Sequence, residues 1–453
     1  MKEVTISETS SLGAQTYMQI QPDWSNACEF FWLDVYKRNI KIAPSNVNTV
    51  DPDEHLVAEV QSSPSIQYQL PLSIDEQTSS GPHYARICNR DISKVEIEVA
   101  QQDKTSIKKL RTIFQAPNET VDIPSSELEA VNKQTLQLYT VDVSQDERYV
   151  VVGGTDGACM LWDKQNRAQM LPLKGHVADV TRARFFPSSK VVLTGSLDLT
   201  LRIWSVQGRC AAVMKGHLGG IEDVVILGRG RNVLSCGNDG LIQLWNCGTQ
   251  DAIAKWANDD QSPVHCLSVM HDAAQLFVKG DSQPHISENE AETDGKVFYA
   301  GLDNGEMLGV DIRARAAVLN LENLAGSILS CAATTATASV PMLFTGSEDG
   351  LLTVWDLRHF RTPLHALSRS SAPIHSVVVS ALYSDNNTSS GSIWTAHGDG
   401  VCSKWSNLGE TPHVSTELTG PQYDAVRGVA IGAQSGRIFT ACRDGRLREY
   451  SPL

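Results

Sequence analysis

The chain has 453 residues, of which 41 % are hydrophobic and 20 % charged, and a formal net charge of −14. This composition is typical of a folded globular protein and excludes a largely disordered chain. The acidic balance disfavours nucleic acid and anionic membranes as ligands, because both select basic surfaces. The first residues contain no long apolar run, and the ten cysteines lack metal-binding spacing. We therefore expect a cytoplasmic and nuclear protein with no metal and no cofactor.

Residues 1–130 contain strand-like stretches but no internal repeat. Residues 30–36 are rich in aromatic and β-branched side chains, and residues 95–99 alternate strictly between apolar and acidic side chains. We expect a small β-rich N-terminal domain over this part of the chain. A segment near residues 110–114 is a candidate for the outer strand of the last repeat, because the chain ends just beyond the last repeat aromatic.

Residues 131–453 repeat one pattern, an apolar run, a turn containing Asp-Gly or a relative, and a closing aromatic. The turn positions are Asp156, Asp198, Asp239, Asn304, Asp349, Asp399 and Asp444. They recur every 41 to 50 residues, apart from one interval of 65, and the aromatic follows six residues later in all but the fourth copy. This spacing predicts an all-β fold, a seven-bladed WD40-type β-propeller. The long interval contains an acidic stretch at about 280–295, which we expect to be a flexible surface loop.

The polar residues of the repeat predict a structural hydrogen-bond network. In the second copy, an imidazole and a carboxylate are expected to bridge strands through a serine hydroxyl to the indole N–H, which satisfies groups that are costly to bury unpaired. The third copy has Gly237 at the expected serine position, and the fifth lacks the histidine. The expected network residues are His176, Ser196, Asp198, Trp204, His217, Asp239, Trp245, Ser347, Asp349 and Trp355.

Catalysis is not expected. A catalytic pair of His176 and Asp198 is an alternative, but a histidine recurs after a glycine at the same blade position, as a repeat dictates. The sequence contains no H-E-x-x-H, G-x-S-x-G, Walker A or G-x-G-x-x-G motif. The propeller is therefore expected to bind another protein rather than to transform a substrate.

Several stretches resemble one WD family in particular, the proteasomal ATPase-associated factors. They comprise residues 173–180 with 184–187, residues 215–221 with the Gly-Arg-Gly-Arg-Asn-Val run at 228–233, and residues 417–420 with 439–445. The resemblance covers roughly residues 135–453. Fungal relatives in this family are assembly chaperones of the proteasome regulatory particle. The resemblance thus implies a protein that binds the C-terminal domain of a proteasomal ATPase subunit during assembly of the regulatory-particle base.

An acidic propeller face suits such a partner, because negative charge steers a basic domain towards it. Asp179, Glu222 and Asp223 are predicted at the entrance of the innermost strands, near the face that meets partners. A rival function rests on Trp355-Asp356-Leu357-Arg358, which matches the W-D-x-R pattern by which some WD proteins dock on the adaptor of a cullin-type ubiquitin ligase. In that case the protein is a substrate receptor.

Overall fold

The computed structural model describes residues 10–26, 30–44, 56–62, 66–71, 84–91, 93–102, 107–123, 136–166, 170–258, 260–271, 288–322, 326–334, 340–380, 392–409 and 411–452. Over these residues the chain is all-β, as predicted, with two short 3₁₀ turns, η1 (Trp24–Asn26) and η2 (Thr155–Gly157). This part of the chain holds no helix of the length and apolar character needed to cross a membrane.

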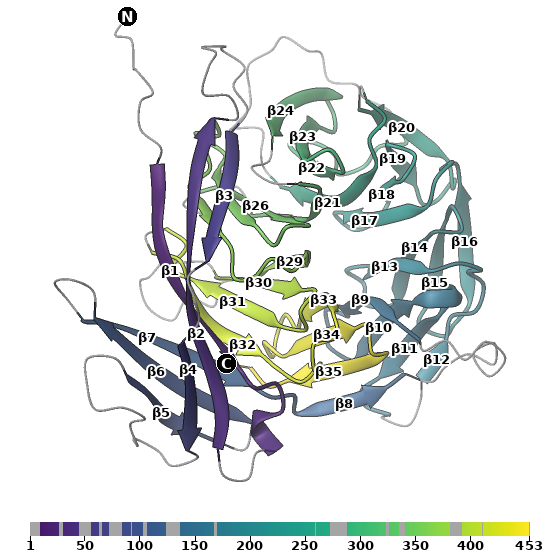
Figure 1. Cartoon of the computed structure of the whole chain (residues 1–453). Coiled ribbons are helices and arrows are strands. Elements are labelled where there is room, and N and C mark those ends of the chain that lie inside the picture. The colour runs from purple at the N-terminus through teal and green to yellow at the C-terminus, as the bar shows by residue number, and fades with distance from the viewer. Residues whose placement is uncertain are drawn as a thin grey trace, which may run out of the picture.

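Antiparallel sheets surround a central channel and form a β-propeller (Figure 1). The first two sheets are β9 (Leu138–Val143), β10 (Tyr149–Gly154), β11 (Cys159–Asp163), β12 (Met170–Pro172), and β13 (Val180–Phe185), β14 (Val191–Ser196), β15 (Thr200–Ser205), β16 (Cys210–Lys215). The next two are β17 (Ile221–Leu227), β18 (Asn232–Gly237), β19 (Leu241–Asn246), β20 (Ala252–Ala257), and β21 (Val264–Met270), β22 (Val297–Leu302), β23 (Glu306–Asp311), β24 (Ala316–Glu322). They are followed by β25 (Ile328–Ala333), β26 (Met342–Ser347), β27 (Leu352–Asp356) and β28 (His365–Leu367).

The last two sheets of the ring recruit strands from the N-terminal part of the chain. One consists of β29 (Ile374–Ser380), β30 (Ser392–His397), β31 (Cys402–Ser406) and β32 (His413–Leu418), and is extended by β7 (Ile107–Gln115), β6 (Lys94–Gln102) and β5 (Tyr84–Arg90). The other consists of β33 (Val426–Ile431), β34 (Ile438–Cys442), β35 (Arg446–Tyr450) and β8 (Glu119–Asp122). Each innermost strand contacts the next one around the channel, and β33 contacts β9, so the ring closes.

The outer strand of the last sheet is β8 and not the predicted segment near residues 110–114. That segment lies in β7, which pairs in parallel with β32 of the preceding sheet. Strand β8 pairs instead with β35, and Arg446 lies opposite Asp122. The strand that pairs with β35 therefore lies a few residues later in the sequence than the predicted segment.

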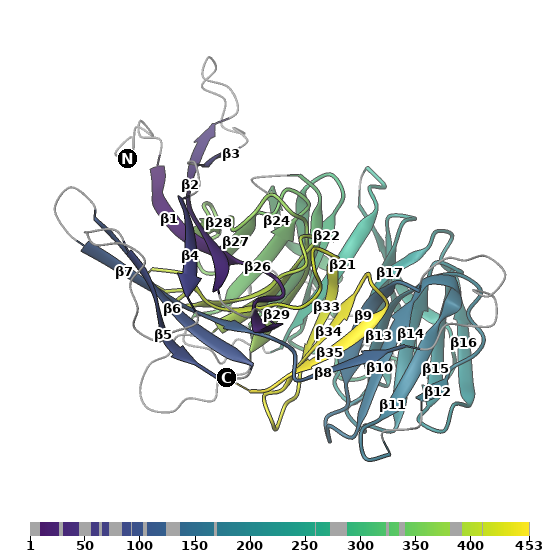
Figure 2. The same cartoon turned by 60° about the horizontal axis from the view of Figure 1, so that its bottom comes forward.

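The strand-like stretches at residues 30–36 and 95–99 do form strands, within β2 (Phe30–Pro44) and β6. Strand β2 pairs with β1 (Ser10–Ile20), β3 (Leu56–Ser62) and β4 (Ile66–Pro71) in a separate sheet. Strands β5 to β7, in contrast, continue a propeller sheet and project from its rim (Figure 2). The described N-terminal strands are thus divided between a separate sheet and the extension of a propeller sheet, and both parts share one apolar cluster, which includes Leu33 and Ile97.

The N-terminal sheet docks on the β29–β32 sheet through aromatic side chains. Tyr17 packs edge-on against Trp405, with ring centroids 6.1 Å apart. The indole of Trp24 is fully buried and donates a hydrogen bond of 3.1 Å to the Thr419 hydroxyl. Beneath this contact, the buried guanidinium of Arg369 lies 2.6 Å from a Glu417 oxygen. Aromatic burial therefore fixes the sheet in place.

Each propeller sheet is covered on both faces by its neighbours. Strand β18 is buried at every position, which a strand achieves only when both of its faces are packed. Between this sheet and the next, Leu234 and Leu244 join Phe298 in one apolar cluster. Stacking of adjacent blades thus produces most of the apolar core.

The acidic stretch predicted at about 280–295 is described from residue 288 onward, and its earlier part lies outside the described residues. The described part is not a free surface loop. Glu290 is almost fully buried and forms an ion pair of 2.6 Å with Arg315. The backbone N–H of Ala291 donates a 2.6 Å hydrogen bond to the Asn232 side chain, and Arg229 lies 3.7 Å from Glu292. The stretch is therefore held against the Gly-Arg-Gly-Arg-Asn turn between β17 and β18.

Candidate protein-binding face

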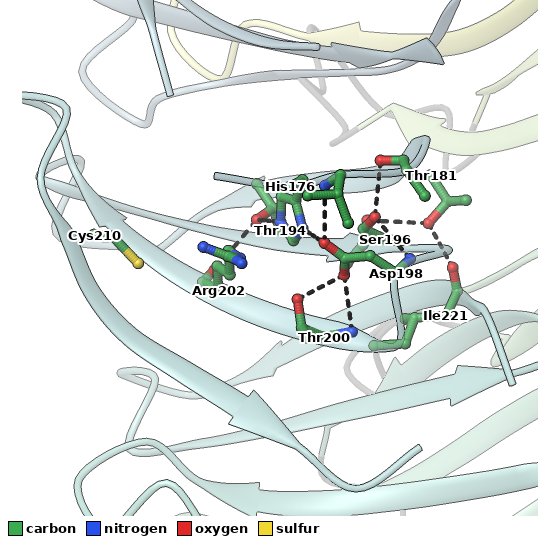
Figure 3. Close-up of polar contacts among 12 residues, drawn as sticks. His176, Thr181, Thr194, Ser196, Asp198, Thr200, Arg202, Cys210 and Ile221 are labelled. Atoms are coloured by element: carbon green, nitrogen blue, oxygen red, sulfur yellow. Dashed lines mark hydrogen bonds and ion pairs between the residues drawn. The ribbon is translucent and has the colours of Figure 1, made fainter. Parts of the chain in front are cut away.

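The predicted polar network exists in the second blade, but a different hydroxyl carries it. Asp198 lies 2.8 Å from Nδ1 of His176, so that nitrogen bears the proton and Nε2 accepts (Figure 3). Nε2 lies 2.7 Å from the Thr194 hydroxyl, which also accepts a 2.9 Å hydrogen bond from the indole N–H of Trp204. Ser196, the predicted bridge, instead donates to the carbonyl of Ala178. The prediction was two residues late, and both positions lie on the same face of β14.

The protonation states of this network follow from its surroundings. Burial lowers the pKa of the His176 imidazole below its ordinary value, although Asp198 opposes this shift. Burial raises the pKa of Asp198, but hydrogen bonds from Thr200 and His176 outweigh it and leave that pKa below its ordinary range. The pair is therefore a neutral imidazole beside a carboxylate and is tied into strands β14 and β15, which fits a scaffold.

The third blade keeps the complete network through Ser235, and the assignment of Gly237 to the hydroxyl position was wrong. Nε2 of His217 lies 2.7 Å from Ser235, which accepts a 2.8 Å hydrogen bond from Trp245. Nδ1 of His217 lies 2.9 Å from Asp239. The hydroxyl again stands ten residues before the tryptophan.

Other blades keep only parts of the network. In the fifth, the Trp355 indole donates to Thr353 at 2.9 Å, while the predicted Ser347 accepts from the backbone of Leu351 and Asp349 lies in the following turn. In the first blade, the position ten residues before Trp162 is Val152, and the buried indole nitrogen finds no hydrogen-bond partner among the described residues.

The mouth of the central channel is lined by one side chain from each innermost strand. In every one of these strands the pairing with its neighbour skips the second residue, which is the signature of a β-bulge. The skipped residues are Tyr139, Thr181, Glu222, His265, Leu329, His375 and Arg427, and we call them the mouth ring. Together with Asp179, Arg182 and Leu197 they line a cavity of about 270 Å³.

Two of the three predicted partner-binding acids lie at this mouth. Asp179 accepts a 3.0 Å hydrogen bond from the backbone of Asp156. Glu222 accepts a 2.7 Å hydrogen bond from Asn238, and burial raises the pKa of its carboxyl above the ordinary value. Burial and the adjacent Asp179 raise the pKa of the Tyr139 hydroxyl. The acids therefore face the cavity from one side.

Asp223, in contrast, does not belong to the surface, and its prediction as a partner contact was wrong. Its side chain is almost fully buried and forms an ion pair of 3.1 Å with Arg182 of β13. It also accepts a 2.9 Å hydrogen bond from the backbone of Leu267 in β21. Asp223 thus braces three neighbouring innermost strands. Neighbouring Glu222 is the residue skipped at the bulge, and its side chain lines the cavity instead.

Exposed apolar side chains surround the mouth on the face where the innermost strands begin, which we call the mouth face. Val177 and Leu218 are 83 % and 84 % exposed, and Tyr423 is 58 % exposed. All three lie in loops that lead into innermost strands. These exposed apolar side chains lie beside the polar groups of the mouth and are available for contact with a protein partner. These contacts were not predicted from the sequence. Val177 and Leu218 each directly follow a Gly-His pair, and this position was a usable signal.

The W-D-x-R stretch lies on the opposite side of the propeller, at the end of β27, whose last two residues are Trp355 and Asp356. Leu357 is buried, and Arg358 forms a two-pronged ion pair with Asp356, with the shorter distance 2.7 Å. The guanidinium is about half exposed. Its carboxylate-binding edge is therefore already occupied by its own blade.

No group of three or more His, Cys, Asp or Glu side chains in the described residues is arranged to hold a metal ion. The nine cysteines within those residues are all free, and six of them are buried. Burial raises the pKa of Cys159 to about 12, which keeps that thiol protonated and unreactive.

Comparison with known proteins identifies the repeat. The family model described as "WD domain, G-beta repeat" matches residues 131–163, 168–205 and 208–246. These three segments match WD repeats. The 26S proteasome regulatory subunit RPN14 of Saccharomyces cerevisiae is 31 % identical over 248 residues, which are 52 % of this chain and 57 % of that protein. Mouse Jouberin is 27 % identical over 48 % of this chain and 20 % of its own length.

Pre-mRNA-processing factor 19 of Bos taurus is 27 % identical over 41 % of this chain and 33 % of its own length. The chain thus spans little more than half of RPN14 and less of the other two relatives. The predicted family is thus supported by the WD repeats within residues 131–246 and by the similarity to a proteasome regulatory subunit.

Proposed function

We propose that this chain is a non-catalytic protein-binding platform, which binds the C-terminal domain of a proteasomal ATPase subunit during assembly of the regulatory-particle base. In this proposal it is a seven-bladed propeller with a small N-terminal domain, and it acts in the cytoplasm and nucleus. The similarity to a proteasome regulatory subunit supports the choice of partner.

The observation that carries the proposal is the composition of the mouth face. Asp179 and Glu222 converge on the cavity, and the strongly exposed Val177 and Leu218 flank them. Contacts that surround a charged centre exclude water from it, and the lower local dielectric strengthens charge pairing there. The chain's acidity suits a basic domain.

Co-purification tests the partner. A tagged chain expressed in cells is recovered, and its bound proteins are identified by mass spectrometry. The proposal expects base ATPase subunits without the mature proteolytic core. Recovery of a cullin and its adaptor without ATPases would instead favour the ligase-receptor function of Arg358 and its neighbours.

Charge reversal tests the surface. We expect Asp179→Lys with Glu222→Lys to weaken binding of the ATPase domain at least tenfold, because like charges then meet at the interface. The matched control is Asp251→Lys, since Asp251 is an exposed acid in the turn before β20, on the opposite side of blade three. Equal affinities of the mouth-face variant and the control would refute the assignment of the face.

A further inference from the structure

The mouth of the channel carries charges of both signs. Asp179 and Glu222 come from the side of blades two and three, whereas His375 and Arg427 come from β29 and β33. Burial, with a smaller effect of neighbouring cationic groups, lowers the pKa of His375 to about 3, so this imidazole is neutral near pH 7. The permanent positive charge on that side of the mouth is therefore that of Arg427.

Arg427 has no counter-ion among the residues that the structure describes. Within the described part of the chain, its Nε is buried without a hydrogen-bond partner, and its guanidinium carbon lies 5.5 Å from the centre of the Tyr139 ring. Burial lowers the pKa of this guanidinium below its ordinary value. The buried Arg369, in contrast, is paired with two carboxylates. Partial burial of a guanidinium without a counter-ion costs free energy, and an anion that binds there would offset this cost.

The shape of the cavity limits what this anion can be. A volume of about 270 Å³ lies just below the range for sites that bind small molecules, which is roughly 300–1,000 Å³, but it suffices for one or two side chains. The planar guanidinium matches the geometry of a carboxylate. A partner that brought only cations would cover Arg427 and leave its charge further desolvated.

We propose that the channel mouth takes a side-chain carboxylate of the protein partner on Arg427, next to a Lys or Arg of the same partner that contacts Asp179 and Glu222. The mouth therefore recognises two side chains of opposite charge on the partner, and not a basic side chain alone. The identity of the partner rests on the proposed function, whereas the chemistry of the site rests on the cavity and on Arg427.

The first experiment measures binding of purified ATPase C-terminal domains to the full chain by calorimetry. Arg427→Gln is expected to weaken binding at least fivefold, because it removes the charge and leaves the partner's carboxylate unpaired. Arg443→Gln is the matched control, since Arg443 lies on the same blade and face but outside the cavity and pairs with Asp424. This control is expected to change the affinity less than threefold.

A loss below fivefold for Arg427→Gln would overturn the carboxylate site, even if charge reversal at Asp179 and Glu222 abolished binding and so upheld the proposed function. If Arg427→Gln does not fold, Arg427→Lys takes its place. This variant keeps the charge but loses the two-pronged geometry, and a loss of at least threefold is then expected.

If no ATPase domain binds the wild-type chain, the proposed function fails, and a second probe decides the inference alone. The peptide N-acetyl-Lys-Glu-amide carries both charges on side chains, and N-acetyl-Lys-Gln-amide lacks the carboxylate. The chain is labelled with ¹⁵N-arginine, and the Nε–H resonance of Arg427 is assigned as the one that is missing from the spectrum of Arg427→Lys. The first peptide is expected to shift this resonance. The second peptide is expected to leave this resonance in place. Equal shifts, or none, would overturn the inference.

Discussion

Replacement of Thr194 by valine tests the hydrogen-bond network of the second blade. Valine has nearly the same shape, so the change removes one hydroxyl and creates little empty space. Two buried groups then lose their partner, the indole N–H of Trp204, 1 % exposed, and Nε2 of His176, whose side chain is fully buried. An unsatisfied buried polar group costs about 1–3 kcal/mol, so we expect a loss of about 2–4 kcal/mol in unfolding free energy.

Urea denaturation followed by tryptophan fluorescence and by circular dichroism measures this loss, provided that both probes give the same transition. The midpoint is expected to fall with an unchanged slope. A loss of less than about 0.5 kcal/mol would refute the assignment of Thr194 as the bridging hydroxyl. Ser235→Ala in the third blade is expected to behave alike, because Ser235 joins the same two groups there.

Three further predictions concern stability. Val152→Thr supplies the missing hydroxyl to Trp162, and we expect a denaturation midpoint no lower than that of the wild type. Burial lowers the pKa of His375 to about 3 and of His397 to about 4, below their ordinary value, so the unfolded chain binds protons first on acidification. The contribution of these histidines to the unfolding free energy is therefore fully present above about pH 6.5 and is lost as the pH falls towards 4. His397 alone is expected to account for a loss of about 2–3 kcal/mol at pH 4.5. Denaturation at several pH values measures this loss. Trp24→Ala removes a fully buried indole, so limited proteolysis is expected to cleave the N-terminal sheet while the propeller transition persists.

The repeat could be predicted from the sequence because it depends on residues that are close together in the chain. A turn at a fixed distance before an aromatic reports a hairpin, and the hairpins β10–β11, β14–β15 and β18–β19 lie where this pattern predicts them. The bridging hydroxyl was misplaced because Thr194 and Ser196 are two apart and face the same way. The distance of ten residues before the tryptophan, shared by Thr194 and Ser235, was the better signal.

The remaining features depend on contacts between distant residues. Strands β7 and β8 pair with strands more than 300 residues away, and this pairing decides which of them completes the last blade. A local sequence pattern contains no information about such distant pairing. The mouth ring arises from bulges, and a bulge shifts which side chains reach the channel. Asp223 and Glu222 are adjacent acids in the sequence, and only the bulge shows that one braces strands while the other faces the cavity.

The pairing of β8 with β35 has a consequence for synthesis of the protein on the ribosome. Residues 119–122 emerge early, but the strand that they pair with ends at residue 450. Until β35 is translated, β8 has no strand to pair with, and its backbone N–H and C=O groups stay unpaired. The nascent chain therefore spends most of its translation as an open arc, and its exposure to chaperones and aggregation ends only with the final strand.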